Sequence, residues 1–397
     1  MRISYTPEQE ALRRQLRAYF DTLLTPERRE ALMATTGEYG TGDVYRETVA
    51  QMGRDGWLAL GWPAEYGGQA RSAMDQLIFT DEAAVAGAPV PFLTINSVAP
   101  TIMEFGTEEQ KKFYLPRIAS GDIHFAIGYS EPEAGTDLAN LRTAAVRDGD
   151  EYIVNGQKMW TSLIQYADYV WLAVRTDNGS GDGGGKKHRG ISVLIVPTDA
   201  DGFSWTPVHT MAGPGTSATY YSDVRVPVGN RVGDENGGWK LVTNQLNHER
   251  VALVSAQPIF TALNQVRSWA QETKDARGMR LIDSEWVQLH LARVHAKAEY
   301  LKLINWELAS AQAAAPSPAD ASAAKVFGTE LACEAYRLLM EILGPSATLR
   351  QDSPGALLRG RVERMHRAAL ILTFGGGTNE VQRDIIGMVA LGLPRNR

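Results

Sequence analysis

The sequence predicts an α+β protein that is mostly α-helical, and three observations indicate this fold class. Apolar residues recur at three- and four-residue intervals from Tyr5 to Ala119, which is the period of packed amphipathic helices. Short β-branched and aromatic stretches occupy the region from Ile123 to Gly233. Long helical patterns return beyond Gly238. We therefore expect an N-terminal helical domain at residues 1–120, a middle β domain at 121–233 and a C-terminal helical bundle at 234–397.

Local patterns place the elements within these regions. Turn residues between Gly61 and Gly68 divide the first helical region. The Gly-rich segment 178–190 predicts an exposed hairpin tip, and breaks near residues 275–280, 313–319 and 344–354 separate the later helices. Strands are expected at residues 152–154, 169–175, 191–197 and 219–226.

Composition excludes several classes of protein. Of the 397 residues, 44% are hydrophobic and 22% are charged, as in ordinary globular proteins. A formal net charge of −6 argues against nucleic acid or an anionic membrane as partner. The single cysteine, Cys333, cannot form an intrachain disulfide, so we expect a reducing, cytoplasmic location. Three prolines interrupt the uncharged run 83–103, which favours a buried helical passage over a membrane span.

Common catalytic motifs are absent from the sequence. The glycines near residue 185 are not followed by the Ser or Thr of a phosphate-binding loop. His290 and His295 are five residues apart, so they lie on different helical faces, and there is no HExxH; we expect no metal site. No GxSxG motif supports a serine hydrolase.

A different set of motifs runs along nearly the whole chain. The stretch 105–141 includes SEPEAGTD, and it is accompanied in order by GWPAEYGG at 61–68, NGQKMWTS at 155–162, DVRVPVGNRVG at 223–233, HERV at 248–251 and FGGGTNEVQRDII at 374–386. With these motifs in this order, the chain resembles the acyl-CoA dehydrogenase family. The resemblance implies helices, then a small β-barrel, then a four-helix bundle, in agreement with the reading of the residues.

The resemblance also implies an FAD enzyme that removes hydrogen from the α and β carbons of an acyl-CoA thioester. A base removes the α proton while hydrogen bonds polarise the thioester carbonyl, and the β hydrogen leaves as hydride to flavin N5. Electrons then pass to an electron-transfer flavoprotein. Two other functions remain open: a flavin oxidase or monooxygenase on the same fold, and a non-catalytic subunit that supports a partner's flavin.

Several residues acquire cofactor roles through the resemblance. Tyr129, Ser130 and Thr136 would contact FAD, and Thr136 would also contact the thioester arm of the substrate. Trp160 would cover the flavin edge, and Ser162, where the family usually has Thr, would hydrogen-bond N5. Thr378 and Glu380 complete the implied cofactor set. The alternative for 131–137 is a tight turn that only connects strands, and for Trp160 taken alone packing in the core is the better reading.

The position of the catalytic base departs from the usual family pattern. Most members carry Glu in a C-terminal YEGT motif, but this chain has Gly376 there, between Gly375 and Gly377. A minority place Glu before Arg on the first helix of the bundle, where this chain has Glu249 and Arg250. We therefore predict Glu249 as the base, although a solvated helical glutamate is the alternative. Substrate contacts are predicted at Asn247, Arg250, Gly376 and Gly377.

The missing side chain at Gly376 enlarges the pocket beside the α carbon, which favours a bulky or α-branched acyl group. The sequence, particularly the stretches RDGDEYIVNGQK, KVFGTE and ILTFGGGTNEV, looks closest to a subunit of actinobacterial steroid side-chain acyl-CoA dehydrogenases. The predicted substrate is accordingly of the steroid side-chain kind.

A second departure concerns the FAD site shared between subunits. Homomeric relatives complete it with an Arg in RxxFG and a Gln in QxxGGxG of a neighbour. Here Arg277 lacks the FG turn and Glu341 replaces the Gln, so a carboxylate would repel the pyrophosphate. We therefore expect an α2β2 assembly with an unlike acyl-CoA dehydrogenase subunit; sequence drift in a homotetramer is the alternative.

Overall fold

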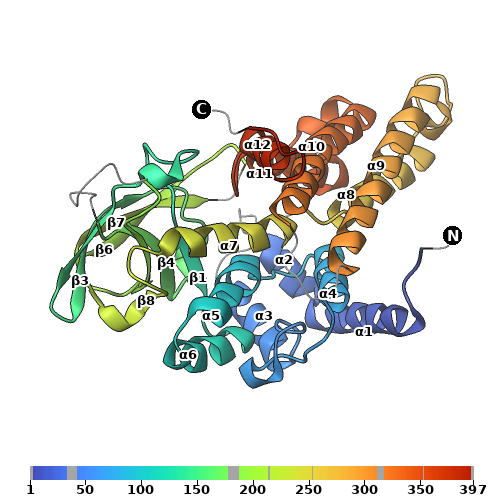
Figure 1. Cartoon of the computed structure of the whole chain (residues 1–397). Helices are drawn as coiled ribbons and strands as arrows, with labels where there is room; N and C mark the ends of the chain where they lie inside the picture. Colours follow the sequence, from blue (N-terminus) through green and yellow to red (C-terminus); the bar gives the residue numbers. More distant parts are fainter. Residues whose placement is uncertain are drawn as a thin grey trace.

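The computed structural model describes residues 3–33, 43–177, 187–212, 215–252, 254–310, 317–351 and 353–394, and for residues 247–252 it describes only the backbone. Helices come first, a sheet follows, and helices return, so the predicted α+β class is confirmed (Figure 1). The tip predicted at 178–190 lies largely outside the described residues. Within the described part of the chain, no helix is long and apolar enough to cross a membrane.

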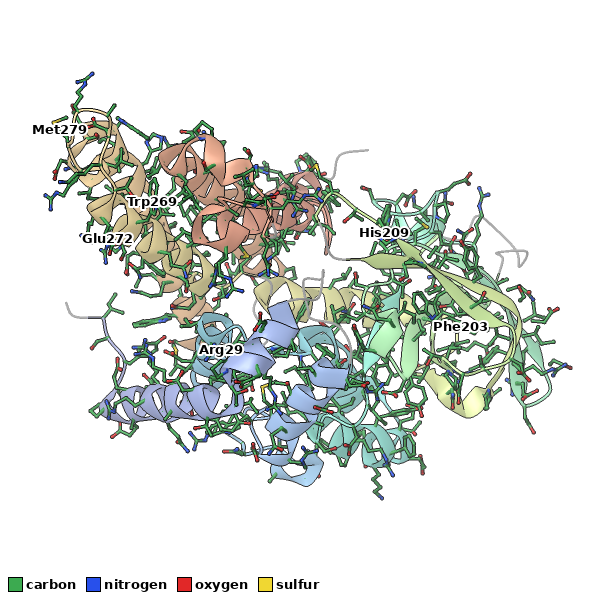
Figure 2. All side chains as sticks on the ribbon, turned by 180° about the vertical axis from the view of Figure 1, so that it is seen from behind. Arg29, Phe203, His209, Trp269, Glu272 and Met279 are labelled. Carbon is green, nitrogen blue, oxygen red and sulfur yellow. The ribbon has the colours of Figure 1, made fainter. Side chains whose placement is uncertain are left out.

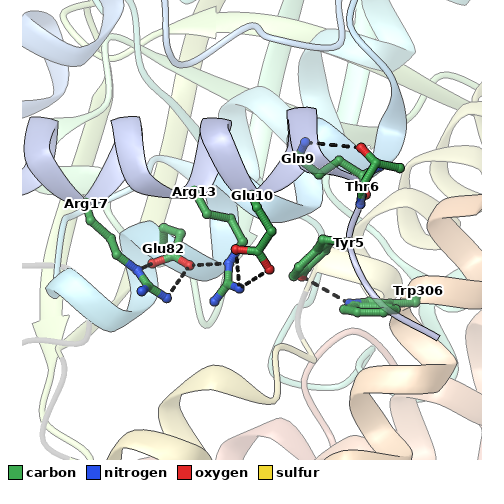
Figure 3. A network of polar contacts seen from close by, with 8 residues as sticks. All are labelled: Tyr5, Thr6, Gln9, Glu10, Arg13, Arg17, Glu82 and Trp306. Carbon is green, nitrogen blue, oxygen red and sulfur yellow. Dashed lines mark hydrogen bonds and ion pairs between the residues drawn. The ribbon is translucent and has the colours of Figure 1, made fainter. Parts of the chain in front are cut away.

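The N-terminal helices are α1 (Pro7–Leu23), α2 (Pro26–Met33), α3 (Asp43–Arg54), α4 (Ala73–Ala86), α5 (Ala99–Phe105) and α6 (Glu108–Ala119). A capping box starts α1: the Thr6 hydroxyl accepts from the Gln9 N–H, and the Gln9 side chain accepts from the Thr6 N–H. The buried Glu82 carboxylate on α4 receives 2.8 Å hydrogen bonds from Arg13 and Arg17 of α1 (Figure 3). This ion-pair cluster holds α1 against α4.

The middle domain is one mixed sheet with strand order β6-β7-β3-β2-β4-β5-β8, and β1 pairs in parallel with β4. Two predicted strands have the predicted bounds, and the other two are longer than predicted. The domain expected as a small β-barrel is thus one mixed sheet. Within the described residues, no ladder joins its end strands β6 and β8. The strands are β1 (Phe125–Gly128), β2 (Ala144–Asp148), β3 (Glu151–Lys158), β4 (Tyr169–Arg175), β5 (Ile191–Pro197), β6 (Phe203–Val208), β7 (Thr216–Pro227) and β8 (Arg231–Val232).

Helix α7 (Gly238–Ala252) leads from the sheet to the C-terminal helices (Figure 1). These are α8 (Gln257–Glu272), α9 (Glu285–Ser310), α10 (Pro318–Leu343), α11 (Arg361–Leu372) and α12 (Asn379–Val389). Their shared apolar core includes Leu301, Leu339 and Val362 and is separate from the core of the sheet. The chain therefore places α11 and α12 opposite the sheet, with α7 between the two halves.

Candidate active site

A cavity of about 1470 Å³ lies where the sheet, α7 and the α11–α12 turn meet. The chain segments after β1 and β3 supply one wall, and Trp239, Thr243 and Leu246 of α7 supply another. The glycine turn, defined here as Gly375–Gly377, closes the side formed by the last two helices. Because pockets for one small molecule are roughly 300–1,000 Å³, this cavity has room for two ligands.

Most predicted site residues meet at this cavity. Glu380 is exposed on the first turn of α12 and does not line it. The side chains of Asn247, Glu249 and Arg250 lie outside the described residues, although their backbone forms the last turns of α7. The predicted site residues that do line the cavity are Tyr129, Ser130, Thr136, Trp160, Ser162, Gly376, Gly377 and Thr378.

The turn after β1 is fixed by a buried ion pair that the sequence patterns did not reveal. Glu131 and Ala134 exchange backbone hydrogen bonds of 3.0 and 3.1 Å, which folds the start of SEPEAGTD into a tight loop. The Glu131 carboxylate accepts from Lys158 Nζ at 2.8 Å and from the N–H groups of Arg142 and Thr143. Lys158 also donates to the Tyr129 carbonyl at 3.0 Å. The loop is thus joined to β3 at the cavity wall.

Electrostatics keep both partners of this pair charged. Burial would raise the pKa of Glu131, but Lys158 and the backbone donors outweigh burial and hold that pKa below its ordinary value. Burial lowers the pKa of Lys158 to about 8, against the opposing attraction of Glu131. Because Lys158 is fully buried, removing either partner would leave an uncompensated charge in the interior.

Trp160 has an unusual backbone conformation at the cavity rim. Its φ of 65° is in the left-handed region, although its side chain is bulky. Flanking hydrogen bonds hold this conformation: Met159 N–H donates to Ser130 at 2.8 Å and Thr161 N–H to Ser217 at 2.9 Å. The indole remains 54% exposed rather than packed in the core. Strain that surrounding contacts maintain is typical of functional sites.

Tyr129 and Ser162 flank this rim with hydroxyl groups held by the sheet. The Tyr129 hydroxyl accepts from the Trp171 indole N–H at 2.9 Å, so the phenol ring is fixed beneath the cavity. Ser162 donates to the Thr216 hydroxyl at 3.3 Å. The Ser162 oxygen therefore retains the capacity to accept a hydrogen bond from a ligand.

The glycine turn depends on backbone conformations that favour glycine. Gly376 has φ 67° and Gly377 has φ 96°. A Cβ on Gly377 would lie 2.6 Å from Gln382 Nε2. The Lys325 ammonium on α10, fully buried, donates to the Gly377 carbonyl at 2.8 Å and to Asn379 Oδ1 at 2.7 Å. The helical pattern around Lys325 gave no signal that this lysine is buried.

The cavity fits a flavin dinucleotide beside an acyl thioester. Apolar side chains of Ile127, Met159 and Trp160 suit a flat ring, and the N–H groups of Gly376 and Thr378 have no acceptor among the described protein atoms. Such N–H groups can donate to ligand oxygens. Across the described residues, no cluster of three His, Cys, Asp or Glu side chains could hold a metal ion.

Neither Glu341 nor Arg277, the residues of the predicted second FAD region, lines this cavity. Glu341 accepts a hydrogen bond from His290 at 2.8 Å and pairs with Arg337. These partners hold the pKa of Glu341 below its ordinary value. The carboxylate is thus ionised and already bonded within its own chain. Arg277 lies in a tight turn closed by the Asp275 side chain, which accepts from its N–H at 2.8 Å.

Comparisons with known proteins agree with this architecture. Models of the acyl-CoA dehydrogenase N-terminal, middle and C-terminal domains match residues 6–122, 126–224 and 236–391. Acyl-CoA dehydrogenase FadE26 of Mycobacterium tuberculosis is 84% identical over 399 residues, covering 100% of this chain and 99% of its own length. Acyl-CoA dehydrogenase FadE29 of the same organism is 46% identical, with the same coverage.

Solved structures are similar to this chain in both fold and sequence. The ChsE4-ChsE5 complex from Mycobacterium tuberculosis contains a chain that is 82% identical, with a TM-score of 0.92 and full coverage of both chains. The Tcur3481-Tcur3483 steroid ACAD contains one that is 48% identical, with a TM-score of 0.90 and full coverage of both. In domain order, fold and sequence, this chain belongs to the acyl-CoA dehydrogenase family, whose members depend on FAD.

Proposed function

We propose that this acyl-CoA dehydrogenase acts on a bulky or α-branched acyl-CoA of the steroid side-chain kind, with Glu249 as base and an unlike subunit completing the FAD site. The glycine turn in the cavity wall carries the proposal, because Gly376 lines the cavity and has no side chain where the resemblance places the carboxylate of most relatives. The similarity to a structure described as a steroid ACAD supports the substrate class.

The course of α7 supports Glu249 as the base. Cavity-lining positions on this helix are 239, 243 and 246, and position 249 lies three residues beyond 246, next to it on the helix surface. A carboxylate at 249 would remove the α proton, while Asn247 and Arg250 would contact the acyl-CoA. The Gly376 N–H would hydrogen-bond the thioester carbonyl and stabilise its developing negative charge.

The residues around Trp160 would hold the cofactor. Tyr129, Ser130, Thr136, Trp160, Ser162 and Thr378 would bind FAD, with Thr136 also reaching the thioester arm, and Glu380 would contact FAD at the outer end of the site. When bound, FAD supplies a ring that accepts the β hydrogen as hydride. An electron-transfer flavoprotein is the proposed electron acceptor; rapid peroxide formation without an added acceptor would instead favour an oxidase. A cytoplasmic location stays a prediction.

We expect Gly376→Glu to reverse the acyl preference, because its side chain would fill the space beside the α carbon. kcat/KM should fall about tenfold or more for branched relative to linear acyl-CoAs. Gly376→Ala is the control, since it brings the same positive-φ strain without filling the pocket. An unchanged substrate ranking in Gly376→Glu would refute the pocket argument.

Exposed apolar residues support assembly with another subunit. Trp286, Leu289 and Tyr300 on α9 are 46%, 61% and 56% exposed, and Met279 lies at the outer tip of the α8–α9 hairpin (Figure 2). Exposed apolar surface of this kind marks contacts with other proteins. Similar chains occur in structures described as the ChsE4-ChsE5 complex and as Tcur3481-Tcur3483. An α2β2 arrangement would bury this surface.

The chain purified alone is expected to hold FAD poorly, because Arg277 lacks the FG turn and Glu341 replaces the Gln of the two signatures that relatives contribute across the interface. Coexpression with the product of a neighbouring reading frame should restore one FAD per unlike pair, and a screen of acyl-CoAs with that complex tests the substrate class. Flavin absorbance gives the amount of bound FAD, and light scattering gives the molar mass of the assembly, so together they give the number of flavins per chain. A stable homotetramer with one flavin per chain would contradict the assembly. A complex that reduces its flavin unchanged after loss of Glu249 would show that Glu249 is not the base, as expected of a non-catalytic chain.

A further inference from the structure

A buried carboxylate on α4 joins the N-terminal helices to the segment between α7 and α8. Asp81 is buried, and its Oδ1 accepts a 2.7 Å hydrogen bond from the Ser255 hydroxyl. The neighbouring carboxylate, Glu82, is the one that pairs with Arg13 and Arg17 of α1 (Figure 3). Asp81 itself forms no ion pair with any described residue. Burying a carboxylate without an opposite charge is costly, and burial raises the pKa of Asp81 to about 6.

The Ser255 hydroxyl is hydrogen-bonded on both sides. Its oxygen accepts from the Gln257 N–H at 3.1 Å, which belongs to the first residue of α8. Since a hydroxyl has a single proton, the proton of Ser255 is the one directed to Asp81 Oδ1. The contact between Asp81 and Ser255 therefore fixes both the start of α8 and the chain just before it.

Val254, the preceding residue, is held by two helices of the bundle. The Asn305 amide on α9 donates to the Val254 carbonyl at 2.6 Å. Gly328, in the KVFGTE stretch of α10, lies against the Val254 side chain, since a Cβ on Gly328 would be 2.7 Å from Val254 Cβ. All three residues are buried. The chain at 254 and 255 is thus fixed by contacts from α4, α9 and α10.

This junction follows directly on the end of α7. The start of that helix is attached to the sheet, because the Asn236 N–H donates to the Ser192 hydroxyl at 2.8 Å. Its last residue is Ala252, and Val254 follows two residues later. The last carbonyl groups of a helix have no partner within it, so a helix end frays unless its neighbours hold it. The contacts at 254 and 255 are the anchor for the turn that contains positions 249 and 250.

We propose that Asp81, acting through Ser255, is a positioning residue that holds the last turn of α7 and so keeps position 249 at the cavity. Asn305 acts in the same way through Val254. The inference rests on the proposed function, in which Glu249 removes the α proton. A displacement of about 1 Å far from the chemistry can cost 10²-fold in rate. Loss of the anchor should therefore slow proton removal and leave acyl-CoA binding nearly unchanged.

The first test measures hydrogen exchange of the α7 amides by mass spectrometry in the assembled, FAD-binding protein, and it requires no turnover. Asp81→Leu and Ser255→Ala each remove the hydrogen bond, whereas Asp81→Asn keeps an oxygen acceptor for Ser255. Loss of a hydrogen bond to a charged group should speed exchange in the peptide 247–252 about tenfold. Asp81→Asn should stay within threefold of wild type.

The second test follows anaerobic reduction of the flavin over a range of acyl-CoA concentrations. Asp81→Leu and Ser255→Ala should lower the limiting rate about tenfold or more, while the concentration that gives half of this rate stays within threefold. Asp81→Asn should restore most of the limiting rate. A purely structural role would instead reduce the amount of folded protein and leave the limiting rate per bound flavin unchanged.

The matched control is Tyr5→Phe, which removes a hydrogen bond between the N-terminal segment and the same bundle without touching the α7–α8 junction. The Trp306 indole N–H on α9 donates to the Tyr5 hydroxyl at 3.1 Å (Figure 3). Tyr5→Phe should be close to wild type in both tests. Equal losses in this control would overturn the inference, because they would report general contact between the two domains.

Exchange within twofold of wild type in both Asp81→Leu and Ser255→Ala would also overturn the inference, as would faster exchange with an unchanged limiting rate. Losses in Asp81→Asn as large as those in Asp81→Leu would contradict the hydrogen bond as the cause. If Asp81→Leu does not fold, Ser255→Ala alone decides. Wild-type protein whose flavin no acyl-CoA reduces would instead refute the proposed function, and the exchange rates would still decide whether Asp81 holds α7.

Discussion

Glu249→Gln is expected to slow the reduction of flavin by acyl-CoA about 10²–10⁴-fold, because the amide has nearly the same shape but cannot accept the α proton. The fold and the yellow colour should be retained. Stopped-flow bleaching of the flavin under anaerobic conditions measures the step directly, since it requires no electron acceptor. A rate within threefold of wild type, about 0.65 kcal/mol, would show that another group is the base.

A control at a contact between α5 and α7 separates the loss of the base from disturbance of α7. The Glu104 carboxylate accepts from the Asn244 amide at 2.7 Å on the outer side of α7, and neither residue lines the cavity. Glu104→Gln therefore makes the same chemical change against the same helix, at an exposed position. We expect it to bleach at nearly the wild-type rate. Equal losses in both variants would point to movement of α7 rather than to missing base chemistry.

Lys158→Met is expected to lower the free energy of unfolding by about 3–5 kcal/mol, because it leaves the Glu131 carboxylate buried without its ammonium partner. The loop that begins SEPEAGTD should loosen, and FAD affinity should fall with it. Urea unfolding followed by circular dichroism gives the stability, and the double variant Lys158→Met, Glu131→Gln should recover part of it. A loss below about 1 kcal/mol would contradict this role.

Lys187→Met provides the matched control at the other end of the same loop. Lys187 pairs with Asp137 at 2.6 Å, but both side chains are about half exposed. Exposed pairs contribute about 0–1 kcal/mol, so this variant should be close to wild type. Because the folded pKa of Glu131 is lowered, the stability from its pairing is present at neutral pH and is lost as the pH falls through that pKa.

Sequence patterns were sufficient to predict the fold class, because the spacing of apolar residues indicates which face of each helix or strand is buried. Strands β4 and β5 begin and end where their β-branched runs do, since a fully buried strand is apolar throughout. The family motifs likewise identified the residues around Tyr129, Trp160 and Thr378, which the fold gathers at one cavity. The role of Glu249 stays a prediction, because its side chain is outside the described residues.

Other parts of the site depend on contacts between residues far apart in the chain. Nothing in the sequence next to Lys158 or Lys325 marks either lysine as a member of a buried polar network, yet both side chains are fully buried. Their partners, Glu131 and Gly377, are 27 and 52 residues away. Hydrophobic periodicity indicates only which positions of an element face inward. A lysine counts as a polar position in that pattern whether its ammonium is solvated or buried in an ion pair.

The sequence by itself determined the order of the domains, the family and the absence of a carboxylate at Gly376, because these are properties of residues taken in order. Only the tertiary structure decided which charges are buried, which backbone donors lack a partner and how large the cavity is. The physical reason is that desolvation depends on what surrounds a group in space: Lys325 becomes a fixed charge beside the glycine turn only once α10 and α12 pack together.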